Sequence, residues 1–270
     1  MGKAIKVKCP AKINLTLKII NKREDGFHNI ESIMQTVSLY DYLTIKICSN
    51  DSFCIELSGN NKEIPYNENN LVYKAIKLYL DSVSIPTSKI SVFIEKNIPI
   101  SAGLAGGSTD AAGVLFGLNE IFDRQLSKNK LHELCALLGS DLNVCLEGGK
   151  LMTKGRGEII EPMEFKNFNL SLIKPINLGI SAKEAYTKFS KKYYVEKKDI
   201  ESRKNYSNDL EWAIINDYTE LKEIKKHYPN AIMSGSGSSY FIIDNEFTHM
   251  DGYWICNNLF AVQNGVSIIE

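Results

Sequence analysis

The sequence lacks the cysteine and histidine patterns that build metal sites or disulfide frameworks. Its six cysteines form no C-x-x-C pair, and no histidine stands beside them at zinc-site spacing. A chain of 270 residues is also long enough to bury a full hydrophobic core without covalent cross-links. We therefore expect reduced, mostly buried thiols in a cytoplasmic protein.

Excess charge of one sign and long apolar runs are missing as well. Lysine plus arginine and aspartate plus glutamate number 32 each, so no bulk positive field exists to attract nucleic acid or an anionic membrane. No apolar run reaches bilayer-spanning length, and the N-terminal residues lack the apolar core of a signal peptide. We expect a small-molecule substrate, no nucleic-acid or membrane partner, and a monomer or homodimer.

An anionic ligand must then be held by a local device. The richest basic stretch, residues 188–198, holds five lysines and is typical of a solvated surface, although it could also touch phosphates. Two common phosphate-binding devices are absent from the sequence. It contains neither the G-x-x-x-x-G-K-[ST] pattern of Walker-type loops nor the H-R-D and D-F-G motifs of protein kinases.

The periodicity of the apolar residues predicts a mixed fold. Alternation predicts strands on either side of Pro10. Asn70, Ser108 and Ser127 stand where helix N-caps are expected. Apolar residues at helical spacing predict helices over residues 71–79, 109–121, 128–138 and 182–189. Because strands and helices do not alternate strictly, we predict the α+β class.

The most informative segment is a glycine-rich loop between a predicted strand and a predicted helix. It contains Pro99, Ser101, Ala102, Gly103, Leu104, Ala105, Gly106, Gly107, Ser108 and Thr109. Glycines let the backbone approach a ligand, and the first helical turn offers free N–H groups at the positive end of the dipole. The pattern predicts a site for a nucleotide triphosphate, with hydroxyls for phosphate oxygens or magnesium. A flexible turn capped by Ser108 explains the glycines alone about equally well.

Three segments, in order, resemble the signatures of the GHMP kinase superfamily (galactokinase, homoserine kinase, mevalonate kinase and relatives). Residues 99–112 are similar to its second signature, P-x-x-x-G-L-x-x-S-S-A, with Ala105 where a third glycine is usual and Thr109 where serine is usual. Residues 233–239 are similar to its third signature. Residues 10–15 and 25–28 resemble P-A-K-[IL]-N-L and D-G-[YF]-H, which mark the branch acting on a cytidine diphosphate conjugate of methylerythritol.

The resemblance spans nearly the whole chain and implies a fold. It implies the two-domain α+β architecture of the superfamily, with the active site in the cleft between the domains. We place the N-terminal domain at residues 1–157 and the C-terminal domain at residues 158–270.

The resemblance also implies two catalytic residues. Asp141 follows a glycine that ends a predicted helix, matches the G-[AS]-D element, and is the candidate base; a plain helix cap is the alternative. Lys12 is the candidate cation for the γ-phosphate, and a solvent-facing strand lysine is the alternative. If Lys12 belongs to an alternating strand, it shares a face with Asn14. The branch has Val-Pro after the base, where this chain has Leu142 and Asn143.

The remaining matches concern the substrate. The resemblance implies that Phe27 and Tyr186 stack on the cytosine and that His28 binds its polar edge; ordinary core or surface aromatics are the alternative, and for Tyr186 taken alone they are slightly favoured. Asn14 is expected to touch the erythritol part. Gly235 belongs to a loop expected to lie against the phosphates, and a plain hairpin turn is its alternative.

The function implied is ATP-dependent phosphorylation of the 2-hydroxyl of the methylerythritol unit, a step in isoprenoid precursor synthesis. ATP and Mg²⁺ are the expected cofactors, and no metal ligand can be named from the sequence. Two alternatives remain open. One is a GHMP kinase for mevalonate, homoserine or a sugar, and the other is a non-catalytic nucleotide-binding protein on the same scaffold.

Overall fold

The computed structural model describes residues 3–49, 54–85 and 88–269 and confirms the α+β class. The strands are β1 (Lys3–Lys22), β2 (His28–Ser49), β3 (Cys54–Gly59), β4 (Ser88–Glu95), β5 (Lys150–Lys154), β6 (Ile159–Pro162), β7 (Asn169–Pro175), β8 (Ile232–Met233), β9 (Tyr240–Ile243), β10 (Tyr253–Phe260) and β11 (Ser267–Ile268). The α-helices are α1 (Leu71–Leu80), α2 (Gly106–Ile121), α3 (Lys128–Leu138), α4 (Leu142–Glu147), α5 (Ala182–Ser190), α6 (Asp209–Ile214) and α7 (Thr219–His227). Shorter turns are the π-helix η1 (Lys191–Glu196) and the 3₁₀ helices η2 (Glu201–Asn205) and η3 (Ile215–Asp217). Within the described ranges, no helix is long and apolar enough to cross a membrane.

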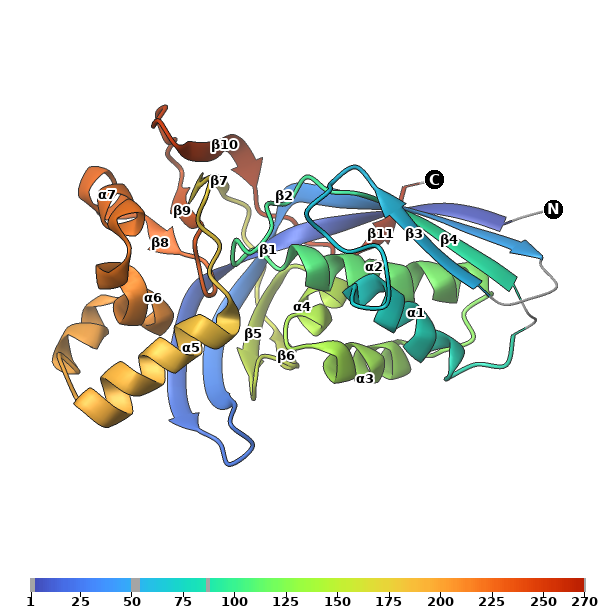
Figure 1. Ribbon diagram of the computed structural model, residues 1–270, viewed down its shortest axis with the longest axis horizontal. Helices are drawn as coiled ribbons and strands as arrows, with labels where there is room; N and C mark the ends of the chain where they lie inside the picture. The colour runs from blue at the N-terminus through green and yellow to red at the C-terminus, as the bar shows by residue number, and fades with distance from the viewer. Residues whose placement is uncertain (1–2, 50–53, 86–87, 270) are drawn as a thin grey trace.

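The long antiparallel pair β1–β2 runs through the whole molecule (Figure 1). The first sheet has the order β11-β1-β2-β4-β3, and β5 and β6 extend it from the other part of β2. β1 is one continuous strand, so the prediction of separate strands around Pro10 is wrong. The pairing register shifts between Pro10 and Ala11 instead, because a proline that cannot donate to the ladder is tolerated at such an irregularity.

The second sheet is antiparallel with the order β10-β7-β9-β8. Figure 1 shows α5, α6 and α7 at this end of the molecule and α1, α2 and α3 beneath the first sheet. The predicted domain boundary at 157/158 falls in the turn between the paired strands β5 and β6, and the C-terminal β11 returns to pair with β1. The division into two domains stays a prediction.

The predicted caps of α1 and α3 are confirmed. The side chain of Asn70 accepts from the N–H of Val72, and that of Ser127 accepts from the N–H of Lys130. The helix predicted from residue 109 begins earlier, at Gly106, so Ser108 lies inside its first turn and is not its cap.

Helix α2 begins within the predicted phosphate-binding segment, residues 99–109, which is called the phosphate loop below, and it packs closely on the first sheet. Its buried residues include Ala112, Leu115 and Leu118. A Cβ atom placed on Gly113 would lie 2.4 Å from the Sγ of Cys9 and 3.1 Å from a methyl carbon of Leu43. The missing side chain at this position therefore sets how near the helix comes to β1 and β2.

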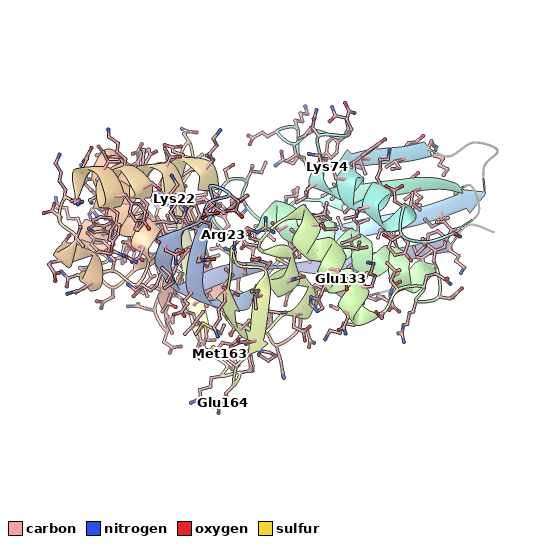
Figure 2. All side chains as sticks on the ribbon, turned by 90° about the horizontal axis from the view of Figure 1, so that it is seen from below. Lys22, Arg23, Lys74, Glu133, Met163 and Glu164 are labelled. Carbon is pink, nitrogen blue, oxygen red and sulfur yellow. The ribbon has the colours of Figure 1, made fainter. Side chains whose placement is uncertain are left out.

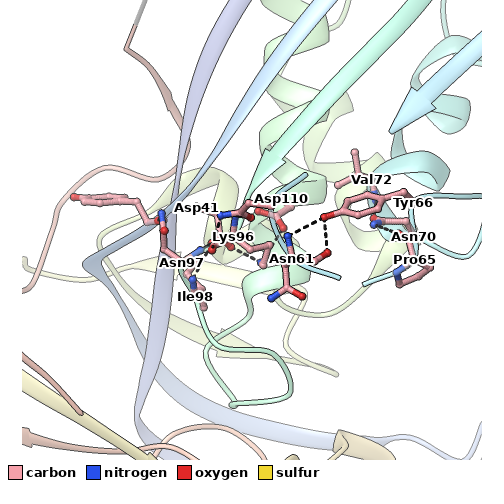
Figure 3. A network of polar contacts seen from close by, with 12 residues as sticks. Asp41, Asn61, Pro65, Tyr66, Asn70, Val72, Lys96, Asn97, Ile98 and Asp110 are labelled. Atoms are coloured by element: carbon pink, nitrogen blue, oxygen red, sulfur yellow. Dashed lines mark hydrogen bonds and ion pairs between the residues drawn. The ribbon is translucent and has the colours of Figure 1, made fainter. Parts of the chain in front are cut away.

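A buried ion triad fixes both ends of the phosphate loop (Figure 3). The ammonium of Lys96 donates to Asp41 on β2 and, at 2.9 Å, to Asp110 on α2. Asp41 also accepts from the backbone N–H groups of Asn97 (2.6 Å) and Ile98 (2.8 Å), directly before the loop. Burial raises the pKa of Asp110 to about 7, against the opposing effect of the Lys96 charge.

Gly113→Ala should lower the free energy of unfolding by about 1–3 kcal/mol, because the new methyl group overlaps Cys9. Gly107→Ala is the matched control in the same helix, since its Cβ would meet nothing within 4 Å. The control should be neutral or stabilising by up to about 1 kcal/mol. Urea unfolding of the two variants checks this, and equal midpoints would contradict the close packing of α2.

Lys96→Met should cost about 3–5 kcal/mol of stability, because it leaves two buried carboxylates without their counter-charge. Lys89→Met is the control, on β4, which ends directly before Lys96. Lys89 pairs with Glu56 at 2.6 Å, but the two side chains are 36% and 57% exposed, so its loss should cost under about 1 kcal/mol. Urea midpoints measure both, and a small loss for Lys96→Met would show that the triad does not hold the loop.

Candidate active site

Lys12 lies at the centre of the predicted site. Its side chain is only 3% exposed, and its ammonium is 2.7 Å from Oδ1 of Asn14, 3.2 Å from the carbonyl oxygen of Gly103 and 3.2 Å from Oδ2 of Asp141. The shared face of Lys12 and Asn14 that alternation predicts is therefore present. A solvent-facing lysine is excluded, and the three acceptors come from β1, the phosphate loop and the α3–α4 link.

Asp141 faces Lys12 and does not cap a helix. It stands at the N-cap position of α4, but its side chain makes no capping hydrogen bond. With 29% of the side chain exposed, the carboxylate can accept a proton from a bound hydroxyl.

The two residues after Asp141, which differ from the branch pattern, hold the start of α4 in place. Leu142 is fully buried. Asn143 donates to the carbonyl of Glu158 at 2.8 Å, and its Oδ1 lies 3.1 Å from Nδ1 of His132. These contacts fix the backbone on which Asp141 stands.

The phosphate loop turns sharply into α2. Ser101, Gly103 and Ala105 have φ values of 51°, 73° and 61°. The left-handed conformation of Ala105 costs about 1–2 kcal/mol for a residue with a Cβ, which explains why glycine is usual at this position in the signature. Gly106, Gly107 and Ser108 then form the first helical turn, whose N–H groups have no acceptor within the helix.

The remaining predicted loop residues lie at different depths in the structure. Ala102 and Leu104 are buried, and the carbonyl of Leu104 accepts from the N–H of Lys12 at 3.1 Å. Thr109 is fully buried, whereas Ser108 and Pro99 are half-buried, and the role of the Thr109 hydroxyl stays a prediction.

The loop between β8 and β9, residues 234–239, interlocks with the phosphate loop. Ser234 Oγ donates to the carbonyl of Gly103 at 3.0 Å, and the N–H of Ser239 donates to the carbonyl of Ala102 at 3.2 Å. A Cβ on Gly103 would lie 2.1 Å from the carbonyl oxygen of Ser234, and one on Gly235 would lie 3.2 Å from Nζ of Lys12. This segment is a hairpin connection, and it also lies against the phosphate loop.

His28 and Tyr186 meet at the other end of the site. The imidazole of His28 is 6% exposed as a residue and stacks on Tyr186, with ring centroids 5.2 Å apart and planes inclined by 21°. Burial lowers the pKa of His28, and the charge of Lys22 adds to this effect, so the ring is neutral at pH 7. Burial raises the pKa of Tyr186, and the negative charge of Asp141 raises it further.

Phe27 is not part of this stack. Its side chain is 51% exposed, and the guanidinium of Arg156 lies 5.1 Å from the centre of its ring. The structure thus brings His28 and Tyr186 together and leaves Phe27 at the surface.

Sequence reasoning missed Ser190, whose Oγ lies 2.9 Å from Nε2 of His28. The signal that could have found it is the spacing on α5: Tyr186 and Ser190 are four residues apart and share a face of the helix.

The described residues contain no group of three or more His, Cys, Asp or Glu side chains that could hold a metal ion.

Known proteins are similar to this chain in sequence and in fold. A model of the GHMP kinases N terminal domain matches residues 70–149, from α1 to the end of α4. The chain is 40% identical over 256 residues to the 4-diphosphocytidyl-2-C-methyl-D-erythritol kinase of Clostridium tetani, covering 88% of this chain and 90% of the relative. It is 41% identical to the enzyme of the same name from Clostridium perfringens, covering 88% of each.

A solved structure agrees with these relatives. The crystal structure of a 4-(cytidine 5'-diphospho)-2C-methyl-D-erythritol kinase superposes with a TM-score of 0.71 at 25% identity, covering 97% of this chain and all of that one. The chain therefore belongs to the GHMP kinase superfamily and, within it, to the family of 4-diphosphocytidyl-2-C-methyl-D-erythritol kinases.

Proposed function

We propose that this protein transfers the γ-phosphoryl group of ATP to the 2-hydroxyl of 4-diphosphocytidyl-2-C-methyl-D-erythritol, in the methylerythritol phosphate route to isoprenoid precursors. The observation that carries the proposal is the contact between the Lys12 ammonium, Asp141 and the Gly103 carbonyl of the phosphate loop. Phosphoryl transfer to an alcohol requires a cation, a carboxylate and a loop of backbone donors close together.

The ammonium of Lys12 has three acceptors before any ligand arrives. A γ-phosphate oxygen must replace one of them, and Asp141 is the one with a partly exposed side chain. Lys12 then neutralises charge on the phosphoryl group, while the released carboxylate accepts the proton of the substrate hydroxyl.

The first turn of α2 would hold the phosphates of ATP. Its free N–H groups and the positive end of the helix dipole suit an anion, and the half-buried Ser108 adds a hydroxyl. Mg²⁺ would be held mainly by phosphate oxygens and water, with the hydroxyl of Ser108 as a candidate protein ligand, and it would neutralise phosphate charge.

The substrate's cytosine would bind at His28 and Tyr186. The contact of Asn14 with the erythritol part stays a prediction, since both ends of its amide are occupied: Oδ1 by Lys12 and Nδ2 by Ser32 at 2.8 Å. In the free protein Asn14 therefore orients Lys12. Stacking of Phe27 on the base requires its exposed ring to move inward. A cytoplasmic location and a monomeric or homodimeric state also stay predictions.

The test of the proposed function is ADP release, by coupled assay, with ATP, magnesium and 4-diphosphocytidyl-2-C-methyl-D-erythritol. Mevalonate and homoserine are run in parallel as rival acceptors. We expect turnover with the cytidine substrate alone. Turnover with another alcohol only would keep the kinase class but overturn the substrate, and ATP binding without any turnover would favour a non-catalytic role.

Asp141→Asn should lower kcat by about 10²–10⁴-fold, because an amide can still accept from Lys12 but cannot take up the hydroxyl proton. Substrate affinity should change little. Asp123→Asn, which alters a carboxylate whose side chain is 83% exposed, is the control and should keep full activity. Steady-state kinetics measure both variants. Unchanged kcat in Asp141→Asn would remove Asp141 from the role of base.

His28→Ala should weaken CMP binding by about tenfold or more and leave ATP binding nearly unchanged, because the imidazole lies at the aromatic end of the site and not at the phosphate loop. His249→Ala, at a side chain that is 85% exposed, is the control. Calorimetric titration with CMP and ATP gives both affinities. An equal loss of affinity for CMP and for ATP would show a general loss of structure instead of the loss of one contact to the base.

A further inference from the structure

The imidazole of His28 is held in one orientation by aromatic rings from α5 and η1. Besides Tyr186, Tyr194 lies nearly parallel to it, with centroids 6.5 Å apart and planes inclined by 22°. Phe189 meets it edge-on at 6.2 Å and 89°. Figure 2 labels Lys22 and Arg23, which lie where β1 ends and the turn toward β2 begins; His28 is the first residue of β2. The plane of the ring is therefore set before any ligand binds.

Ser190 supplies the hydrogen-bond partner of this ring. Its Oγ is 2.9 Å from Nε2 of His28, and among the described residues no hydrogen bond reaches Nδ1. A neutral imidazole has one N–H donor and one acceptor nitrogen, so the partner at Nε2 decides what Nδ1 presents to a ligand. The lowered pKa of His28 keeps the ring in this neutral form.

We propose that Ser190 determines the choice of pyrimidine by donating its hydroxyl hydrogen to Nε2 of His28, which keeps the ring proton on Nδ1. The inference rests on the proposed function, in which His28 reads the edge of a cytosine. Ser190 acts through His28, to which its Oγ is hydrogen-bonded, and is therefore a positioning residue.

Cytosine and uracil differ at N3, so the position of the imidazole proton of His28 decides which of the two bases can pair with Nδ1. N3 of cytosine is a hydrogen-bond acceptor, so it can accept from Nδ1–H. N3 of uracil carries a hydrogen and would face the same donor, which leaves both groups unpaired on binding. A base bonded in the plane of His28 also lies nearly parallel to Tyr186, because the two rings are inclined by only 21°. In this arrangement the hydroxyl of Ser190 favours cytosine over uracil, and the bound base can stack on Tyr186.

The test compares the dissociation constants of CMP and UMP for the wild type, Ser190→Ala and Ser190→Thr. The wild type should prefer CMP. Ser190→Ala should lose about tenfold of this preference, because the ring can then place its proton on Nε2 and accept from uracil. Ser190→Thr keeps a hydroxyl and should restore the preference. ATP affinity, measured in parallel, reports on the integrity of the phosphate loop.

A second readout follows the ring itself. Long-range ¹⁵N–¹H NMR distinguishes the two tautomers, and the chain has only four histidines, so His28 is assigned from the signal lost in His28→Ala. We expect the Nδ1–H form in the wild type and a shift toward Nε2–H in Ser190→Ala. A wild type in the Nε2–H form, or an unchanged CMP preference in Ser190→Ala, would overturn the role of Ser190 alone. A wild type that does not bind CMP would overturn the cytidine assignment together with it.

Discussion

The buried ammonium of Lys12 is the constraint on which the site depends. A charge that is nearly removed from water must be met by acceptors, or it destabilises the fold. Here Asn14, Gly103 and Asp141 meet it from three separate segments. Because the ammonium of Lys12 contacts all three residues, it fixes β1, the phosphate loop and the start of α4 relative to one another. The arrangement that suits phosphoryl transfer is therefore also the arrangement that lets this lysine be buried.

Neighbouring contacts make that arrangement rigid. The triad of Asp41, Lys96 and Asp110 holds the two ends of the phosphate loop, so the loop keeps its shape despite the strained backbone of Ala105. Close packing at Gly113 then presses α2 onto the first sheet. Local strain at the predicted phosphate site is thus offset by burial and charge pairing a few residues away.

The sequence predicts most of what depends on local pattern. Alternation around Ile13 places Lys12 and Asn14 on one face, and the caps of α1 and α3 follow from their residue types. Features set by distant contacts are not predictable in this way. α4 is too short to show helical periodicity, and Ser190 meets His28 across 162 positions of sequence. The position of Phe27 likewise depends on its contact with Arg156, which no motif records.

The interlock of Gly103 with Ser234 has a consequence for motion. The carbonyl of Gly103 accepts from both Ser234 and Lys12, and even a Cβ atom on Gly103 would clash with the carbonyl oxygen of Ser234. Opening the molecule at this point would break these bonds and the one between Ser239 and Ala102 together. We therefore expect the movement that admits a ligand at the opposite end, where Phe27 is exposed. In that case the predicted catalytic groups would stay in register while the predicted recognition end adjusts to the nucleoside.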